Sequence, residues 1–227
     1  WQAVGIAPIR RNWSGLVPVP GDGRYEWDGY LEIKHKPHVY NPSKGYWATA
    51  NENLVPPDYE HRDAVGWSWS DPFRSARIGE VLSSGRRFTM AEMMQLATDY
   101  VSLPARSLVP LLRGLELDEH EHEARGELLD WSFELAPGSR KAAIYVAWER
   151  ELQGSITNLV IPAEIRSTLG FPSMKKIIDW LGSPPTWFSE LGEGNPVVGR
   201  DRFLAQTFSQ AIQGLSDRFG QSPWEYG

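Results

Sequence analysis

The chain has 227 residues, of which 41% are hydrophobic and 23% charged, a composition typical of a globular protein that buries a core. Its formal net charge is -6 and no apolar run reaches the roughly 20 residues of a membrane helix, so we expect neither a nucleic acid nor a membrane as a partner. The absence of cysteine excludes disulfides and a thiolate nucleophile, and is compatible with either an oxidising or a reducing compartment.

The first third of the chain is rich in turn-forming residues, with proline, glycine and asparagine between short apolar runs. Tyr30–Ile33 and Tyr46–Thr49 have the composition of short strands joined by structured loops. We therefore predict a part made of β-strands and loops over residues 1–87. The tryptophans gathered in it could line a groove, although large aromatic side chains more often serve packing.

From Phe88 onward the apolar residues recur with a helical period. Thr89 and Glu92 have the spacing of a capping box, and the methionines that follow predict a helix of about three turns before Pro104. The same period predicts three further helices, at residues 105–112, 127–133 and 142–152. In the last of them, Ile144, Trp148 and Leu152 share one face.

A final helix is predicted after the proline pair Pro184-Pro185 and the glycine-rich connector that follows, neither of which continues a helix. Asp201 is expected to cap this helix. Apolar residues then recur at spacings of four, four, three and four and form one stripe, at Leu204, Phe208, Ile212, Leu215 and Phe219. Residues 88–199 are thus predicted to form a helical subdomain, and residues 200–227 a separate helical part.

Motifs for a nucleophile or for zinc are weak when each is taken alone. Ser173 and Lys176 fit S-x-x-K, but the companion motifs of the serine enzymes that use it are missing, so we predict a helix cap and solvated lysines. His120 and His122 are two residues apart and would diverge on a helix, which favours an exposed acidic run over a pair of zinc ligands.

Three polar features of the first part have both a structural and a functional interpretation. Asp58 and Asp63 lie in one loop and could bind calcium together with backbone carbonyls, although two carboxylates fit a solvent-exposed turn equally simply. Arg74 follows several aromatic residues and would seek a fixed acceptor or a ring face. Asn51 follows a run of small residues and could simply hold a turn together.

The order of several short elements separates these alternatives, because ordered elements are far more specific than any one of them. The dense elements are Pro8-Ile9-Arg10, Trp13-x-Gly15, Pro18-Val19-Pro20-Gly21, Trp27-x-Gly29, Asn41-Pro42, Gly45-Tyr46, Thr49-Ala50-Asn51, and Trp69 to Pro72 with Arg74 and Arg77-Ile78. Sparser elements follow at Ala105-Arg106, Leu129-x-Trp131, Ser139, Trp148 and Pro223-Trp224-Glu225-Tyr226-Gly227. In this order they resemble the penicillin amidase family over nearly the whole chain.

That resemblance implies an α+β fold, namely part of the αββα sandwich of an N-terminal-nucleophile hydrolase with a helical subdomain, to which the helix of residues 200–227 returns. In the family, a precursor cleaves itself and exposes a serine at the start of its larger chain. Residue 1 here is Trp. The resemblance therefore implies that this chain is a fragment of the larger chain, without the nucleophile, and inactive alone; its partners would be the remainder of the same precursor and an N-acyl amide substrate.

The resemblance also assigns roles to single residues. Asn51 matches the family's oxyanion-hole asparagine, whose side-chain N–H donates to the negative oxygen of the tetrahedral intermediate. Arg74 matches an arginine that supports the active centre, and Asp63 matches a calcium-ligating aspartate of some members. Glu52 stands where the family more usually has a neutral residue. The chemistry would need no cofactor, and calcium would be structural.

The expected activity is hydrolysis of an N-acyl amide, such as a β-lactam side chain or an acyl-homoserine lactone, and the family's usual location is the bacterial periplasm or the exterior. The alternative from another class is a self-contained, non-catalytic module whose aromatic-rich first third binds a peptide or a sugar.

Overall fold

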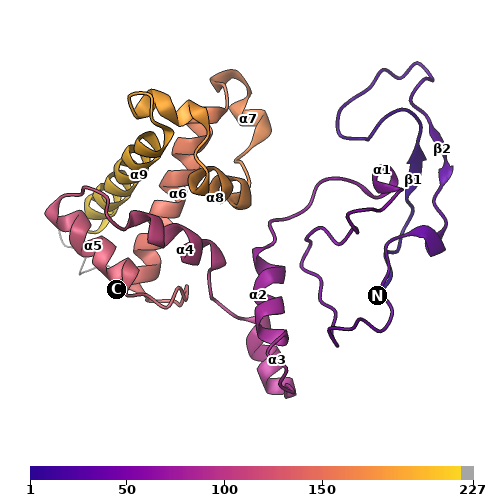
Figure 1. The fold of residues 1–227 in the computed structure, drawn as a ribbon, viewed down its shortest axis with the longest axis horizontal. Helices are drawn as coiled ribbons and strands as arrows, with labels where there is room; N and C mark the ends of the chain where they lie inside the picture. Colours follow the sequence, from indigo (N-terminus) through magenta and orange to yellow (C-terminus); the bar gives the residue numbers. More distant parts are fainter. Residues whose placement is uncertain (221–227) are drawn as a thin grey trace. The chain divides into compact units, whose positions relative to one another are not determined.

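The computed structural model describes residues 1–220, which fall into two compact units that divide between Phe88 and Thr89. The predicted element Pro223–Gly227 lies outside the described residues. The first unit contains little regular structure and the second is helical, as the hydrophobic periods predict (Figure 1).

The first unit contains one two-stranded antiparallel sheet, in which Pro8 pairs with Tyr30 and Arg10 with Trp27. Its elements are β1 (Pro8–Arg10), β2 (Trp27–Tyr30), a 3-10 helix (Ile33–His35), α1 (Arg62–Val65) and α2 (Phe73–Leu82). Long loops connect these elements, as the density of turn residues predicts (Figure 1).

Both strand predictions for this unit were wrong. β2 ends at Tyr30, where the predicted strand was to begin, and Ile33 already starts the 3-10 helix. Residues 46–49 form no strand. A strand requires a second backbone to complete its hydrogen-bond ladder, and a run of aromatic and β-branched residues indicates only that its side chains suit a pleated surface.

The second unit consists of helices joined by short connections (Figure 1). Its elements are α3 (Met90–Ala97), α4 (Leu103–Leu108), a 3-10 helix (Val109–Leu112), α5 (Glu119–Leu129), α6 (Arg140–Val160), a 3-10 helix (Ala163–Ile165), α7 (Arg166–Leu169), α8 (Met174–Gly182), a 3-10 helix (Thr186–Leu191) and α9 (Pro196–Phe219). Among the described residues, no helix has both the length and the apolar character needed to span a bilayer.

The predicted capping box at the start of α3 is present, but the helix is shorter than expected. The Thr89 hydroxyl accepts from the backbone N–H of Glu92, and the Glu92 carboxylate accepts from the backbone N–H of Thr89. The helix ends at Ala97. The Asp99 carboxylate accepts from the backbone N–H of Val101 at 3.0 Å, a local bond that competes with continuation of the helix.

The helix expected at residues 127–133 instead runs from Glu119 to Leu129. The prediction missed a second capping box, in which Asp118 accepts from the backbone N–H of Glu121 and the Glu121 side chain accepts from that of Asp118. The acidic run therefore begins this helix, where negative charge stabilises the N-terminal end of the helix dipole. His120 and His122 both lie on α5, and Nδ1 of His122 is 2.6 Å from Nη2 of Arg125.

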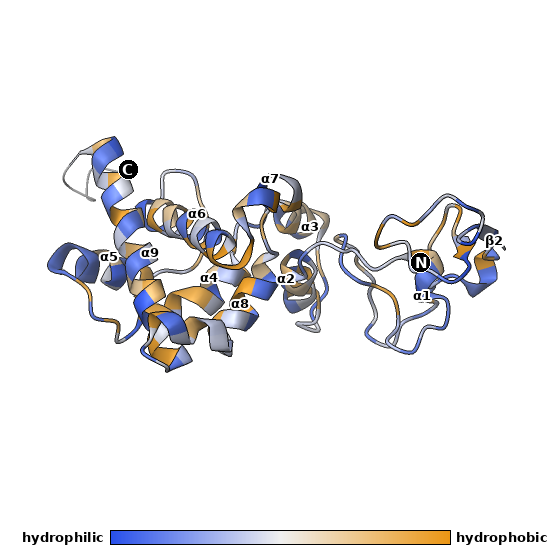
Figure 2. Ribbon diagram, turned by 90° about the horizontal axis from the view of Figure 1, so that it is seen from above, coloured by the Kyte–Doolittle hydropathy of each residue, from blue (hydrophilic) through white to orange (hydrophobic). Residues whose placement is uncertain are grey.

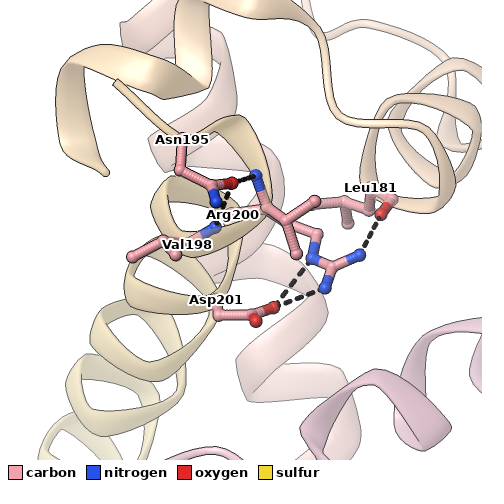
Figure 3. Close-up of polar contacts among 6 residues, drawn as sticks. Leu181, Asn195, Val198, Arg200 and Asp201 are labelled. Atoms are coloured by element: carbon pink, nitrogen blue, oxygen red, sulfur yellow. Dashed lines mark hydrogen bonds and ion pairs between the residues drawn. The ribbon is translucent and has the colours of Figure 1, made fainter. Parts of the chain in front are cut away.

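Two further caps test the local predictions in the second unit. Ser173 caps α8 as expected, by accepting from the backbone N–H of Lys176 at 3.2 Å. Asp201 is not the cap of α9; Asn195 accepts from the first N–H groups of that helix, ahead of Pro196 (Figure 3). Asp201 lies inside the helix and pairs with Arg200 at 2.6 Å.

The core of the second unit lies where α6 packs against α9, which carries both apolar and polar residues along its length (Figure 2). The predicted face of α6 is confirmed, because Ile144, Trp148 and Leu152 are all fully buried. The stripe of α9 is buried over Leu204, Phe208, Ile212 and Leu215, while Phe219 remains half exposed. The helix predicted for residues 200–227 thus begins at Pro196 and packs onto α6 within the second unit.

One partly buried acid in this core predicts a pH dependence of stability. Glu149 lies on α6 beside the buried hydroxyl of Tyr145, and burial raises the pKa of Glu149 above its ordinary value. The folded state therefore binds this proton more tightly than the unfolded chain does, so stability falls as the pH rises from the unfolded towards the folded pKa. We expect Glu149→Gln to raise the melting temperature of the intact protein by a few degrees at pH 8.

The gain should be smaller at pH 4, because burial raises the pKa of Glu149 in the folded state and the wild-type carboxyl then needs little or no ionisation there. Thermal unfolding across that pH range measures the difference. Glu123→Gln, on the exposed face of α5, removes the same charge at a solvated position and should show no comparable pH-dependent gain. Equal shifts for the two variants at both pH values would contradict the role of Glu149 burial.

Candidate active site

The segment that carries Asn51 is held against α2 at two points within the first unit. The Tyr46 hydroxyl donates to the backbone oxygen of Gly79 at 3.3 Å. The Nη2 atom of Arg74 donates to the backbone oxygen of Ala50 at 2.9 Å. Gly79 and Arg74 lie on α2, 33 and 24 residues away in the sequence from their partners Tyr46 and Ala50. The helix therefore holds in place a loop that is not part of a β-sheet.

Asn51 lies in the left-handed region of backbone conformation, with φ of 65°, and its side chain is exposed. Its backbone oxygen accepts from the N–H of Ser70 at 2.9 Å, and its Oδ1 atom accepts from Nη2 of Arg74 at 2.8 Å. An arginine offers only donors, so this contact determines which end of the amide faces it. The NH2 group of Asn51 therefore points away from Arg74, and it makes no hydrogen bond to any other described residue.

Arg74 supports this asparagine through both its backbone neighbour and its side chain. The two hydrogens on Nη2 are divided between the Ala50 carbonyl and Asn51 Oδ1. The guanidinium thus lies behind the amide, and its positive charge polarises the amide so that the distal N–H groups become better donors. Arg74 and Asn51 are thus in direct contact in the structure.

Asp63 lies in a second cluster, built from elements that are widely separated in the chain. Its Oδ1 atom accepts from Nε1 of Trp67 at 2.9 Å, and its backbone oxygen accepts from Arg10. The Arg10 side chain passes directly over Gly15, which has φ of 82° and where an added Cβ would lie 2.6 Å from Nε of Arg10. Only glycine suits this position, which explains why the Trp13-x-Gly15 element accompanies Arg10.

The described residues do not by themselves form a calcium site around Asp63. Within residues 1–220, no group of three or more histidine or acidic side chains is arranged to hold a metal. One oxygen of the Asp63 carboxylate already accepts from Trp67. The two aspartates do not share a loop as predicted, because Asp63 lies on α1 while Asp58 is a solvent-exposed residue of the turn before it. Calcium ligation by Asp63 would require oxygen ligands from elsewhere in the protein.

Two neighbours of Asn51 carry structural roles that the sequence did not reveal. Glu52 accepts from the backbone N–H of Ala50 at 2.6 Å, and Ser70 donates to the Asn51 carbonyl. The pairing of Ser70 with Asn51 has no local signal, because it joins segments on either side of α1. The Glu52 bond has a weak local signal, because an acidic side chain in a turn often accepts from the backbone N–H of a residue close to it in the sequence.

The arrangement displays one oriented amide donor, backed by a cation, at an exposed position. A donor held in advance at such a position can stabilise negative charge that develops on a carbonyl oxygen, without the cost of reorganising at the moment of reaction. Among the described residues, the side chain that hydrogen-bonds to the Asn51 amide is that of Arg74, which is not a nucleophile.

Known acylases resemble this chain in sequence. The chain is 32% identical over 166 residues to the acyl-homoserine lactone acylase QuiP of Pseudomonas fluorescens (strain Pf0-1), a match that covers 66% of this chain and 20% of that protein. It is 30% identical over 153 residues to the penicillin acylase 2 proenzyme of Pseudomonas sp. (strain SE83), again with 66% and 20% coverage. The chain thus spans about a fifth of the length of these relatives.

The fold matches a thermostable penicillin G acylase from Alcaligenes faecalis with a TM-score of 0.74 and 19% sequence identity, over 99% of this chain and 46% of that one. This match confirms the predicted α+β fold class. The family model described as penicillin amidase matches residues 1–227. The ordered elements, the fold and the family model agree, and the chain belongs to the penicillin amidase family.

Proposed function

We propose that the protein containing this chain hydrolyses N-acyl amides, and that Asn51 supplies a hydrogen bond to the oxyanion. The observation that carries this proposal is the contact of Asn51 Oδ1 with Arg74, which leaves the amide N–H groups directed away from the arginine and free of other described residues. Membership of the family favours this activity over a self-contained peptide- or sugar-binding module.

The proposed nucleophile is an N-terminal serine outside these 227 residues. Its hydroxyl oxygen would attack the amide carbonyl carbon, and the carbonyl oxygen would become negative while the α-amino group takes the hydroxyl proton. Collapse of this intermediate breaks the C–N bond, the proton goes to the leaving amine, and the acyl group stays on the serine. Water then releases the acid by the same two steps. Asn51 would donate to the oxyanion in both, while Arg74 positions Asn51.

The partners in this proposal are the remainder of the same precursor and an N-acyl amide substrate. The relatives named above act as an acyl-homoserine lactone acylase and a penicillin acylase, which makes acylated amines of these two kinds the first substrates to test. A periplasmic or secreted location, and a structural calcium completed at Asp63 by ligands from outside this chain, belong to the same proposal.

The test is to incubate the intact, processed protein with a panel of penicillins and acyl-homoserine lactones and to measure the release of primary amine. We expect at least one acyl amide to be cleaved, and cleavage to be lost when the N-terminal serine is replaced by alanine. A penicillin acylase of the family serves as the positive control. A correctly processed protein that releases no amine from any compound, while the control does, would contradict the proposal.

A further inference from the structure

Glu52 directly follows Asn51, the candidate oxyanion donor, and accepts a hydrogen bond from Ala50, the residue that precedes Asn51. Its Oε2 atom accepts from the backbone N–H of Ala50 at 2.6 Å, so the bond spans Asn51 from one side to the other. The Glu52 side chain is partly buried and Ala50 is 7% exposed. A buried backbone N–H needs an acceptor, and Glu52 provides it for Ala50.

The remaining backbone groups around Asn51 are held from other directions. The carbonyl of Ala50 accepts from Arg74 at 2.9 Å, and the carbonyl of Asn51 accepts from the N–H of Ser70 at 2.9 Å. Among residues 1–220, Glu52 is the hydrogen-bond partner on the N–H side of the turn, while Arg74 and Ser70 hold its carbonyl side. Each of the three bonds holds a different peptide group: Glu52 that between Thr49 and Ala50, Arg74 that between Ala50 and Asn51, and Ser70 that between Asn51 and Glu52.

The backbone of Asn51 gives this restraint its importance. A residue with φ of 65° occupies a sparsely populated conformation that asparagine tolerates but does not strongly prefer, and such a conformation persists only when its surroundings hold it. The direction of the Asn51 amide follows from that backbone conformation. An unrestrained turn would relax and carry the side chain away from its contact with Arg74.

We propose that Glu52 is a positioning residue, whose carboxylate clamps the turn at Ala50 so that the Asn51 amide keeps the direction needed to donate to an oxyanion. This inference rests on the proposed function and adds a residue to its machinery. The bond to Ala50 requires an oxygen lone pair, which the negative charge strengthens but which a neutral amide oxygen also supplies. A glutamine at position 52 offers an equivalent oxygen, and it would retain the clamp without the negative charge.

Glu52→Ala and Glu52→Gln, made in the intact, processed protein, test the clamp. We expect Glu52→Ala to lower kcat about 10-fold to 100-fold with little change in KM, the size of effect seen when a supporting hydrogen bond to a functional residue is lost. Glu52→Gln should keep kcat within about a factor of two, because its amide oxygen accepts the same bond. Glu60→Ala, which removes an exposed carboxylate from the same unit, is the control and should leave kcat unchanged.

A second measurement reads the clamp without reference to activity. Hydrogen exchange of a peptide that contains Ala50 should accelerate in Glu52→Ala and remain as in the wild type in Glu52→Gln. Wild-type kcat and wild-type exchange in Glu52→Ala would overturn the proposal, as would equal losses in the alanine and glutamine variants, which would make the charge rather than the bond responsible.

Asn51→Gly, assayed in parallel, separates this proposal from the one on which it rests. If Asn51→Gly retains turnover, the oxyanion role fails and takes the positioning role of Glu52 with it. If Asn51→Gly loses turnover while Glu52→Ala keeps both turnover and slow exchange, only the proposal for Glu52 fails.

Discussion

Replacing Asn51 by alanine in the intact, processed protein should lower kcat for amide hydrolysis by about 10²–10³, with KM close to the wild-type value. The reason is that the hydrogen bond from Asn51 would strengthen as negative charge develops on the carbonyl oxygen, so its loss affects the transition state more than the bound substrate. Steady-state kinetics on the best substrate of the panel measures both constants, once processing of the precursor has been verified.

The backbone at Asn51 requires a matched variant. Alanine at φ of 65° is strained by roughly 1–2 kcal/mol, so part of its effect could arise from a displaced loop. Glycine adopts this conformation without strain and also lacks the donor. We therefore expect Asn51→Gly to lose as much kcat as Asn51→Ala. Wild-type turnover in the glycine variant would remove Asn51 from the mechanism.

Aspartate at the same position tests the sign of the charge. Asn51→Asp preserves the shape of the side chain and can still accept from Arg74, but it replaces the N–H donor with a carboxylate oxygen that repels an oxyanion. Its kcat should be at least as low as that of the glycine variant. Activity near that of the wild type would show that the position needs only the contact with Arg74.

Replacing Trp148 by alanine should destabilise the helical unit by about 3–5 kcal/mol, the typical cost of deleting a buried aromatic side chain. Trp148 is fully buried on α6, its ring lies 5.7 Å from that of Phe208 on α9, and its Nε1 donates to Thr207 at 3.3 Å. Because whole domains are stable by only about 5–15 kcal/mol, this loss is a large fraction of the total. Denaturant unfolding and hydrogen exchange in α6 and α9 measure it.

Trp148→Phe separates packing from hydrogen bonding at that position. Phenylalanine retains most of the ring contact with Phe208 but cannot donate to the Thr207 hydroxyl, which also donates to the backbone oxygen of Leu204 and so keeps a partner. The loss should therefore be clearly smaller than for alanine. Similar losses in the two variants would mean that the hydrogen bond, rather than burial of the ring, dominates at this site.

The sequence proposed the residues of the candidate site but not their geometry. The ordered elements around Asn51 and Arg74 pointed to the family, and the structure brings these two side chains into contact at 2.8 Å. The supporting bonds from Glu52 and Ser70 were not predicted. The Glu52 carboxylate is only a weak local signal and the backbone N–H of Ser70 is none, because each of these groups suits many partners.

What the sequence determined by itself is the local helical structure of the second unit. The buried face of α6, the capping box of α3 and the cap of α8 all depend on residues within three or four positions of one another, so the pattern of side chains is sufficient to predict them. Even there, Asn195 and Asp201 are both acceptable caps only a few residues apart, and the structure uses Asn195 as the cap of α9.

Only the tertiary structure decided the pairing of β1 with β2, the packing of α6 on α9, and the hold of α2 on the segment around Asn51. The bond from Arg74 to Asn51 joins positions 23 residues apart, and that from Trp148 to Thr207 joins positions 59 apart. Such contacts form only when burial of apolar surface elsewhere offsets the entropy of closing the loop between them. That balance depends on the whole unit, and no short stretch of sequence contains it.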